Sequence, residues 1–174
     1  LKLSQNLNIV SQEIEALMCK GIGYLVDANF KEAEVDFKEG LVKASYINDI
    51  GKIADFHNKL GILYQNKNSF FLAIDHFLEA AKYSYKIKDY ESEADAYYGI
   101  SLVYTAQREY KKQLEYIVKA VDVLENNNVN NDLLKTKIYN YAAEQYMEAS
   151  KKNEYPKYAN LGKVYAEKSL KIAN

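Results

Sequence analysis

The order of apolar and polar positions along the chain predicts helices separated by short turns. Apolar residues recur three or four positions apart, as in Leu60, Leu63 and Tyr64, or in Ile100 and Val103. That spacing places them on one face of a helix. Between such stretches, polar and turn-forming residues collect near 47–51, 66–69, 86–90, 107–109 and 126–131. The pattern therefore predicts an all-α chain in which helix and turn alternate.

The same order of residues returns every 40 positions. A small residue is followed by a tyrosine and a second aromatic residue, and the next helix then alternates small or polar with bulky positions. The first unit has Gly21, Tyr24, Phe30, Ala33, Phe37 and Gly40. The second has Gly61, Tyr64, Phe70, Ala73, Phe77 and Ala80, and the third has Ser101, Tyr104, Tyr110, Gln113, Ile117 and Ala120. Recurrence at one spacing is typical of a repeat protein.

A fourth unit departs from this spacing. It begins with Ala143 and Tyr146 and contains an insertion of roughly seven residues around Pro156, the one proline of the chain. Proline is expected to break or kink a helix that runs through it. We predict one domain over 1–174, with residues 1–9 as the possible end of a preceding helix. Its repeats span approximately 11–50, 51–90, 91–130 and 133–174, the last of them degenerate.

The small positions indicate where helices touch. Gly21, Gly61, Ser101 and Ala143 are all small, which suits two helices of a hairpin approaching closely. The tyrosines and phenylalanines are expected to fill the space between neighbouring hairpins. A single hairpin cannot bury its apolar face, so stability should come from stacking.

Composition excludes several classes of function. The 174 residues carry a formal net charge of −1, which argues against a general nucleic-acid or membrane-surface binder. No apolar stretch approaches the roughly 20 residues that span a bilayer. One cysteine excludes an internal disulfide, and two histidines leave little material for a metal centre. We expect no metal, cofactor or membrane insertion. Residues 135–174 are basic, with eight basic and four acidic side chains; this is either a solvated cap or a surface for an acidic partner.

Candidate catalytic residues are few. His57 occupies a core aromatic position of the repeat, so packing is favoured over catalysis. His76 is expected on a solvated face, and Cys19 as a small buried residue without a neighbouring base to activate it. The acid pair Glu32 and Glu34 lies at a predicted helix start, where it suits the helix dipole. We therefore expect no enzymatic activity.

The second unit resembles the tetratricopeptide repeat (TPR) family. The matching positions are Leu60, Gly61, Tyr64, Ala73, Phe77 and Ala80. His57 stands where the family prefers tryptophan. The resemblance covers residues 10–125 closely and 133–174 loosely. It implies a right-handed α-solenoid of stacked antiparallel hairpins. The 40-residue unit is similar to the repeats of kinesin light chains, cell-polarity adaptors and bacterial peptide-pheromone regulators.

The resemblance also implies a binding groove lined by the first helix of each repeat. The positions are Met18 and Ile22; Asp55, Asn58, Ile62 and Gln65; Asp95, Tyr98, Leu102 and Thr105; and Lys137, Asn140 and Glu144. Asparagine side chains both donate and accept, which suits an extended peptide. The clamp with which co-chaperone TPR domains hold a carboxyl terminus is not matched. Its cationic positions are occupied by Met18, Ile22, Asp95 and Gly99.

These features predict a non-catalytic cytoplasmic scaffold that binds a protein or an extended peptide. It would be the interaction or ligand-sensing part of a larger regulatory protein. Two alternatives stay open: a structural module that self-associates into a homo-oligomer, and the sensor domain of a peptide-pheromone-type transcription regulator.

Overall fold

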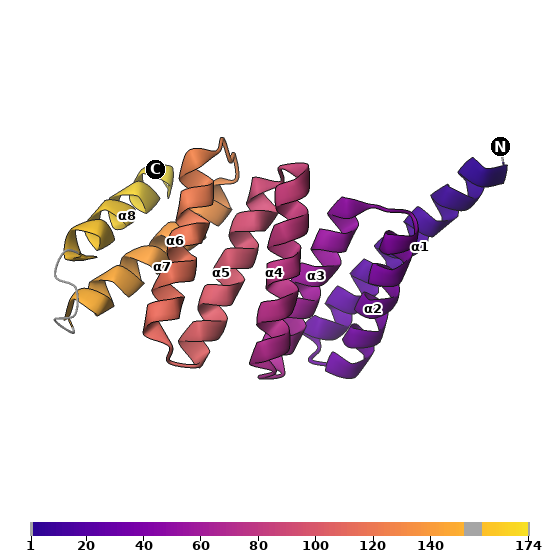
Figure 1. Cartoon of the computed structure of the whole chain (residues 1–174), viewed down its shortest axis with the longest axis horizontal. Coiled ribbons are helices and arrows are strands. Elements are labelled where there is room, and N and C mark those ends of the chain that lie inside the picture. Colours follow the sequence, from indigo (N-terminus) through magenta and orange to yellow (C-terminus); the bar gives the residue numbers. More distant parts are fainter. Residues whose placement is uncertain (1, 152–157, 174) are drawn as a thin grey trace. The chain divides into compact units, whose positions relative to one another are not determined.

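The computed structural model of this chain describes residues 2–151 and 158–173, and within these ranges it has eight helices and no strand (Figure 1). The predicted all-α class of consecutive helix hairpins is confirmed. The helices are α1 (Lys2–Val26), α2 (Phe30–Tyr46), α3 (Ile50–Asn66), α4 (Phe70–Ile87), α5 (Tyr90–Ala106), α6 (Tyr110–Asn126), α7 (Asp132–Lys151) and α8 (Tyr158–Ala173).

The helices are separated by turns that recur every 20 residues. One residue in each of the first five turns has a positive φ between 55° and 61°, and these residues are Ala28, Asn48, Asn68, Lys88 and Arg108. Such a left-handed residue ends a helix by letting the following amides bond back to its last carbonyls. In the first turn, the amide of Asn29 donates to the carbonyl of Tyr24 at 2.8 Å. None of the five is glycine, so the usual sequence signal for this turn is missing.

Polar side chains mark the start of the first helix in three hairpins. The Asp49 carboxylate accepts from the amide of Lys52 at 3.0 Å at the start of α3. Asp89 does the same for Ser92 before α5, at 3.1 Å. Each bond satisfies an amide that the first turn of a helix leaves without a partner. Asn131 caps α7 in the same way.

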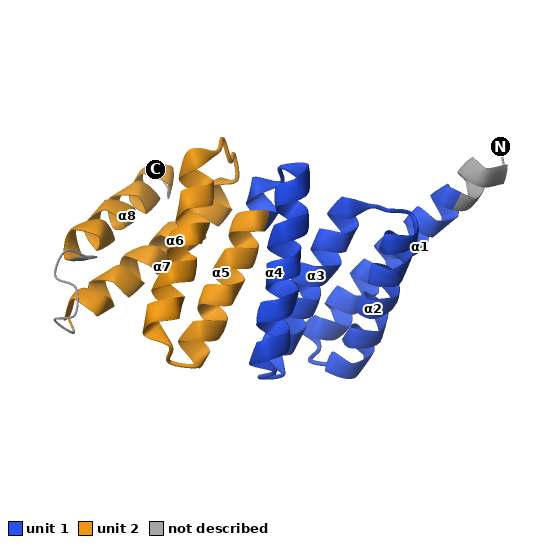
Figure 2. Cartoon of the chain, in the orientation of Figure 1, with its two compact units in different colours: residues 1–92 blue, residues 93–174 orange. Residues whose placement is uncertain are grey.

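The chain divides into two compact units (Figure 2), residues 1–92 and 93–174. In the first unit, α1 packs on α2, α2 on α3 and α3 on α4, and α1 also meets α3. First helices of consecutive hairpins are therefore neighbours. In the second unit α6 packs on α7 and α7 on α8. A hydrogen bond of 2.9 Å from the Ser101 hydroxyl to the carbonyl of Gln113 joins α5 to α6.

The small positions of the repeat are contact points, as predicted. A methyl group added at Gly21 would come 2.4 Å from the Phe37 ring, and one at Gly61 would come 2.7 Å from the Phe77 ring. Each ring comes from the second helix of the same hairpin and is fully buried. The glycine thus makes room for the aromatic residue that the repeat places 16 positions later.

The first hairpin begins earlier in the chain than predicted. Residues 2–9, interpreted from the sequence as the possible end of a preceding helix, are the start of α1, so the first hairpin begins before position 11. The expected helix break at Pro156 lies outside the described residues. The single domain over 1–174 stays a prediction.

Among the helices in the described ranges, none has the length and apolar character needed to cross a membrane.

Candidate functional site

The predicted groove positions of the first unit lie on α1 and α3, which run side by side. The Lys52 ammonium on α3 pairs with Glu15 on α1 at 2.6 Å and with Asp55 at 3.8 Å. Met18 is buried, whereas Ile22 is exposed. The exposed edge shared by these two helices is therefore charged, with one apolar side chain.

The remaining predicted positions on α3 are half-buried or buried. Asp55, Ile62 and Gln65 are half-buried, and Asn58 is buried. Burial raises the pKa of Asp55, although Lys52 and Lys59 oppose the shift. Asn58 therefore belongs to the packed layer between helices, and the polar groups that reach solvent are those of Asp55 and Gln65.

In the second unit, three predicted positions on α5 meet α7 directly. Lys137 donates to the Asp95 carboxylate at 2.6 Å and lies 4.7 Å from the centre of the Tyr98 ring. The Tyr141 ring packs edge-on against Tyr98 at 5.3 Å, and its hydroxyl is hydrogen-bonded to Thr105. Asp95, Tyr98 and Thr105 are thus brought together in one row, with Leu102 half-buried between them.

The partners from α7 were only partly predicted. Asn140 and Glu144 are exposed, and no hydrogen bond or ion pair joins them to α5 within the described residues. The residues that do reach α5 are Lys137 and Tyr141, the second of which sequence reasoning missed. The signal that could have identified Tyr141 is the tyrosine at position 98 on α5. The two rings pack against each other, and this contact sets the register between the third and fourth repeats.

A buried amide extends this row into the core. Gln113 on α6 is 1% exposed, and its side-chain nitrogen donates to the Tyr141 hydroxyl at 3.3 Å and to the side-chain oxygen Oε1 of Gln145. Thr105 donates to the Ser101 carbonyl at 2.9 Å, so its oxygen accepts from Tyr141. The chain of donors thus runs from α6 through α7 to α5. It fixes the direction of the Tyr141 hydroxyl, because each group has one role left.

Three aromatic or imidazole rings stack at equivalent positions in the last three hairpins. In the second hairpin the His76 ring stacks on Tyr64 at 5.3 Å and lies 5.1 Å from His57. The third and fourth hairpins hold tyrosines at the same places. These ring triplets are His57, Tyr64 and His76; Tyr97, Tyr104 and Tyr116; and Tyr139, Tyr146 and Tyr165. Much of the tyrosine content of the chain therefore packs within hairpins.

Hydrogen bonds and charges around Tyr64 join the first two hairpins. The Tyr64 hydroxyl donates to Glu34 on α2 at 2.8 Å, and Lys38 and Lys67 bind the same carboxylate. Burial opposes ionisation of Glu34, but these three hydrogen bonds outweigh it and lower its pKa to about 2. Glu34 is therefore a contact between hairpins as well as an acid near a helix start.

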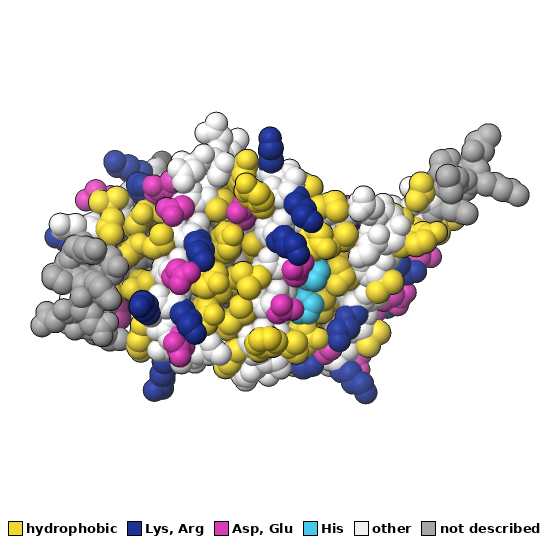
Figure 3. All heavy atoms as spheres, in the orientation of Figure 1, with side chains coloured by type: hydrophobic (Ala, Val, Ile, Leu, Met, Phe, Trp, Pro, Cys, Tyr) yellow, Lys and Arg dark blue, Asp and Glu magenta, His cyan; other side chains and the backbone are white. Residues whose placement is uncertain are grey.

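The two histidines form a pair. Their Nδ1 atoms are 3.0 Å apart, so one donates to the other, and both rings are half-buried. Figure 3 shows them at the surface beside acidic and basic side chains. The ring packing predicted for His57 is confirmed. The solvated position predicted for His76 is wrong, because its ring lies between Tyr64 and His57. Within the described residues, no group of three or more His, Cys, Asp or Glu is arranged to hold a metal.

Protonation of this pair is disfavoured. Burial lowers the pKa of His57 to about 4, and the neighbouring His76 adds to the shift. Burial also lowers the pKa of His76, against the attraction of Asp75. The hydrogen bond between the two neutral imidazoles acts in the same direction as burial, since a second proton would leave two donors facing each other.

Lowering the pH from 7.5 to 5.0 should destabilise the first unit through His57. The unfolded imidazole binds a proton near pH 6.5 and the folded one only near pH 4, so stability is lost as the pH falls through this window. For a fully buried imidazole, this difference in pKa would lower the free energy of unfolding by about 2 kcal/mol at pH 5.0. Because the His57 ring is only half-buried, solvent screening reduces the expected loss to about 1 kcal/mol. Urea denaturation of the wild type and of His57→Tyr, the residue found at position 97, tests this. The wild type should lose more stability than the variant; a parallel loss in both would contradict the assignment.

Cys19 lies at the surface and not in the core. Its side chain is exposed on α1, so the prediction of a small buried residue is wrong. The neighbouring Met18 is buried. One step along a helix turns a side chain by about 100°, so adjacent positions at the edge of the buried stripe face different surroundings.

Comparisons with known proteins agree with this architecture. The sequence matches no protein-family model and no curated protein. Aspartyl phosphate phosphatase F from Bacillus subtilis has a similar structure, with a TM-score of 0.76 and 16% identity over 91% of this chain. BtubC (BKLC) from P. vanneervenii has a TM-score of 0.68 and 14% identity over 97% of this chain. The chain spans 41% of the length of the phosphatase and 74% of BtubC. At these identities the likeness shows the fold alone, and this chain consists of TPR-like helical repeats.

Proposed function

We propose that this chain belongs to the TPR family in its long-repeat form and is a non-catalytic module that binds a protein or an extended peptide. It would be the interaction or ligand-sensing part of a larger, cytoplasmic regulatory protein, and the whole of 1–174 would act as one domain. The TPR-like fold and the sequence positions that match the family support this assignment.

The observation that carries the proposal is the row of side chains shared by α5 and α7. Tyr98, Thr105 and Tyr141 are half-buried, so each presents part of its surface to solvent while its orientation is held by contacts. Asp95 and Lys137 continue the row with a salt bridge. Oriented hydroxyls and ring edges suit the alternating polar and apolar groups of an extended peptide. Because these side chains are already ordered before the peptide binds, the entropy cost of binding is lower.

A peptide selection tests the proposal. Peptides enriched from a random displayed library against the wild-type chain should lose about tenfold or more in affinity when Tyr98 and Tyr141 are both replaced by alanine. The matched control replaces Tyr46 and Tyr85, exposed tyrosines on the second helices α2 and α4. The control should bind as the wild type does. A binding site on the first helices would be contradicted if the affinity of the peptides fell on loss of Tyr46 and Tyr85, or if neither double substitution changed it.

Self-association is the second candidate, and exposed apolar side chains on α4 favour it. Phe71, Leu78 and Tyr85 recur every seven residues on this helix and are all exposed. Apolar surface of this kind commonly marks a contact with another protein. Sedimentation of the same samples distinguishes the two candidates, since a monomer at tens of micromolar would exclude self-association as the main function.

A further inference from the structure

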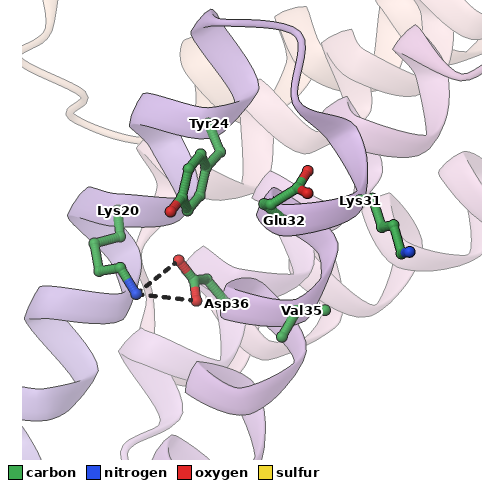
Figure 4. A pocket seen from close by; sticks show the side chains of 6 residues that line it. All are labelled: Lys20, Tyr24, Lys31, Glu32, Val35 and Asp36. Carbon is green, nitrogen blue, oxygen red and sulfur yellow. Dashed lines mark hydrogen bonds and ion pairs between the residues drawn. The ribbon is translucent and has the colours of Figure 1, made fainter.

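A small pocket lies between α1 and α2, away from the groove positions Met18 and Ile22. It has a volume of about 210 Å³ and is lined by Lys20, Tyr24, Lys31, Glu32, Val35 and Asp36 (Figure 4). Pockets for drug-sized ligands are usually larger than about 300 Å³. The size of this one suits a single side chain.

Asp36 supplies a buried carboxylate to the pocket. The residue is 7% exposed, and its two oxygens lie 3.5 Å from the Lys20 ammonium. One oxygen, Oδ2, has no hydrogen-bond partner within the described residues. A buried carboxylate is costly unless it accepts well-formed hydrogen bonds. The Lys20 side chain is 59% exposed, and within the described residues this long contact is its one ion pair, so a better donor can replace it.

Tyr24 supplies an aromatic face that the repeat leaves uncovered. In the other three hairpins the equivalent tyrosine stacks on a ring from the second helix, at 5.3 to 5.7 Å. In the first hairpin Asp36 stands at the position of His76. No ring or cation is found over Tyr24 within the described residues, whereas Lys38 and Lys67 both lie over the Tyr64 ring, at 6.0 and 5.5 Å. The first hairpin therefore keeps the tyrosine, but an acid stands where the other hairpins place the ring that stacks on it.

We propose that this pocket binds the guanidinium group of an arginine side chain from a partner polypeptide. The planar group would stack on Tyr24, as the rings do in the other hairpins, and donate hydrogen bonds to Asp36. Glu32 adds a second carboxylate at the rim. Arginine fits better than lysine because its flat fork of donors stacks on an aromatic face and binds a carboxylate with two bonds. In Figure 4 the Lys31 side chain extends away from Lys20 and Tyr24. The pocket contains none of the predicted groove positions, and its test does not depend on the function proposed for those positions.

An NMR titration with Nα-acetyl-arginine amide tests the site in the full chain. Signals of the Tyr24 ring and the Val35 methyl groups should shift and saturate, with a Kd in the millimolar range. Nα-acetyl-lysine amide should bind about threefold more weakly or worse. The blocked form of citrulline, which has nearly the same shape without the charge, should give no saturable shift. Equal binding of citrulline, or tighter binding of Nα-acetyl-aspartate amide through Lys20 and Lys31, would overturn the proposal.

Two substitutions test how Asp36 and Lys20 affect the affinity of the pocket for blocked arginine. Asp36→Asn keeps the shape of the side chain and should weaken binding of blocked arginine by about tenfold or more. Lys20→Met removes the competing cation and should tighten binding by about threefold. Asp75→Asn is the matched control, because Asp75 is an exposed acid on the next second helix, α4. It should bind as the wild type does. Thermal unfolding of each variant confirms that the fold is intact, and unchanged binding by a folded Asp36→Asn variant would refute the site.

Discussion

Replacing Gly40 by alanine is expected to lower the free energy of unfolding by about 2 to 3 kcal/mol. The added methyl group would lie 2.1 Å from the tip of the Phe56 ring, which comes from α3 of the next hairpin. Phe56 is fully buried and packs edge-on against Phe37 with ring centres 6.4 Å apart. The ring is enclosed on both sides, so the clash must be relieved by moving α2 away from α3.

Gly23→Ala is the matched control for this substitution. Gly23 also lies inside a helix, and nothing is found within 4 Å of its added methyl group. Alanine there should stabilise the protein by about 0.5 to 1 kcal/mol, because it restricts the unfolded chain. Combining Gly40→Ala with Phe56→Leu should cost less than the sum of the two changes. Urea denaturation measures the wild type and the four variants, and equal midpoints for Gly40→Ala and Gly23→Ala would contradict this packing of Gly40 against Phe56.

Replacing Phe77 by alanine should cost about 3 to 5 kcal/mol. Phe77 is 1% exposed and lies over Gly61 on the facing helix of its hairpin. Glycine leaves no side chain that can move into the space of the lost ring, so a cavity remains. Part of the first unit should then unfold at a lower urea concentration than the rest of the chain.

Phe71→Ala is the control in the same helix. Phe71 is 82% exposed, so its truncation should change stability by less than about 0.5 kcal/mol. Tryptophan is absent from the chain, so circular dichroism at 222 nm follows unfolding in both variants. A loss of similar size in the two variants would mean that the ring over Gly61 does not hold the hairpin together.

The hairpins themselves were predictable because their signals are local. Small residues at 21 and 61 and aromatic residues 16 positions later set the face on which each helix packs, and the structure places Phe37 and Phe77 on those glycines. The five turns predicted from 47–51 onward were located to within about two residues, whereas the turn between Val26 and Phe30 was not predicted. The regular 20-residue spacing of left-handed turns was not predicted, because Ala28, Lys88 and Arg108 carry no turn signal.

The contacts between helices were harder to predict. His76 was assigned to a solvated face because its neighbours in sequence, such as Asp75, are polar. Its ring instead stacks on Tyr64 and meets His57, residues that lie 12 and 19 positions away. The fourth repeat shows the same limit. Tyr165 stacks on Tyr146 across a longer separation in sequence than in the other repeats, so the register there depended on an insertion.

By itself, the sequence determined that this chain is a series of helix hairpins, because helical periodicity and a 40-residue spacing are properties of single segments and their order. Only the tertiary structure decided what equivalent positions do. His76, Tyr116 and Asp36 occupy the same place in three repeats, yet the first two stack on a tyrosine and the third faces a pocket. The physical reason is that stacking and ion pairing depend on which atoms meet across helices, and a repeat pattern specifies the position but not the partner.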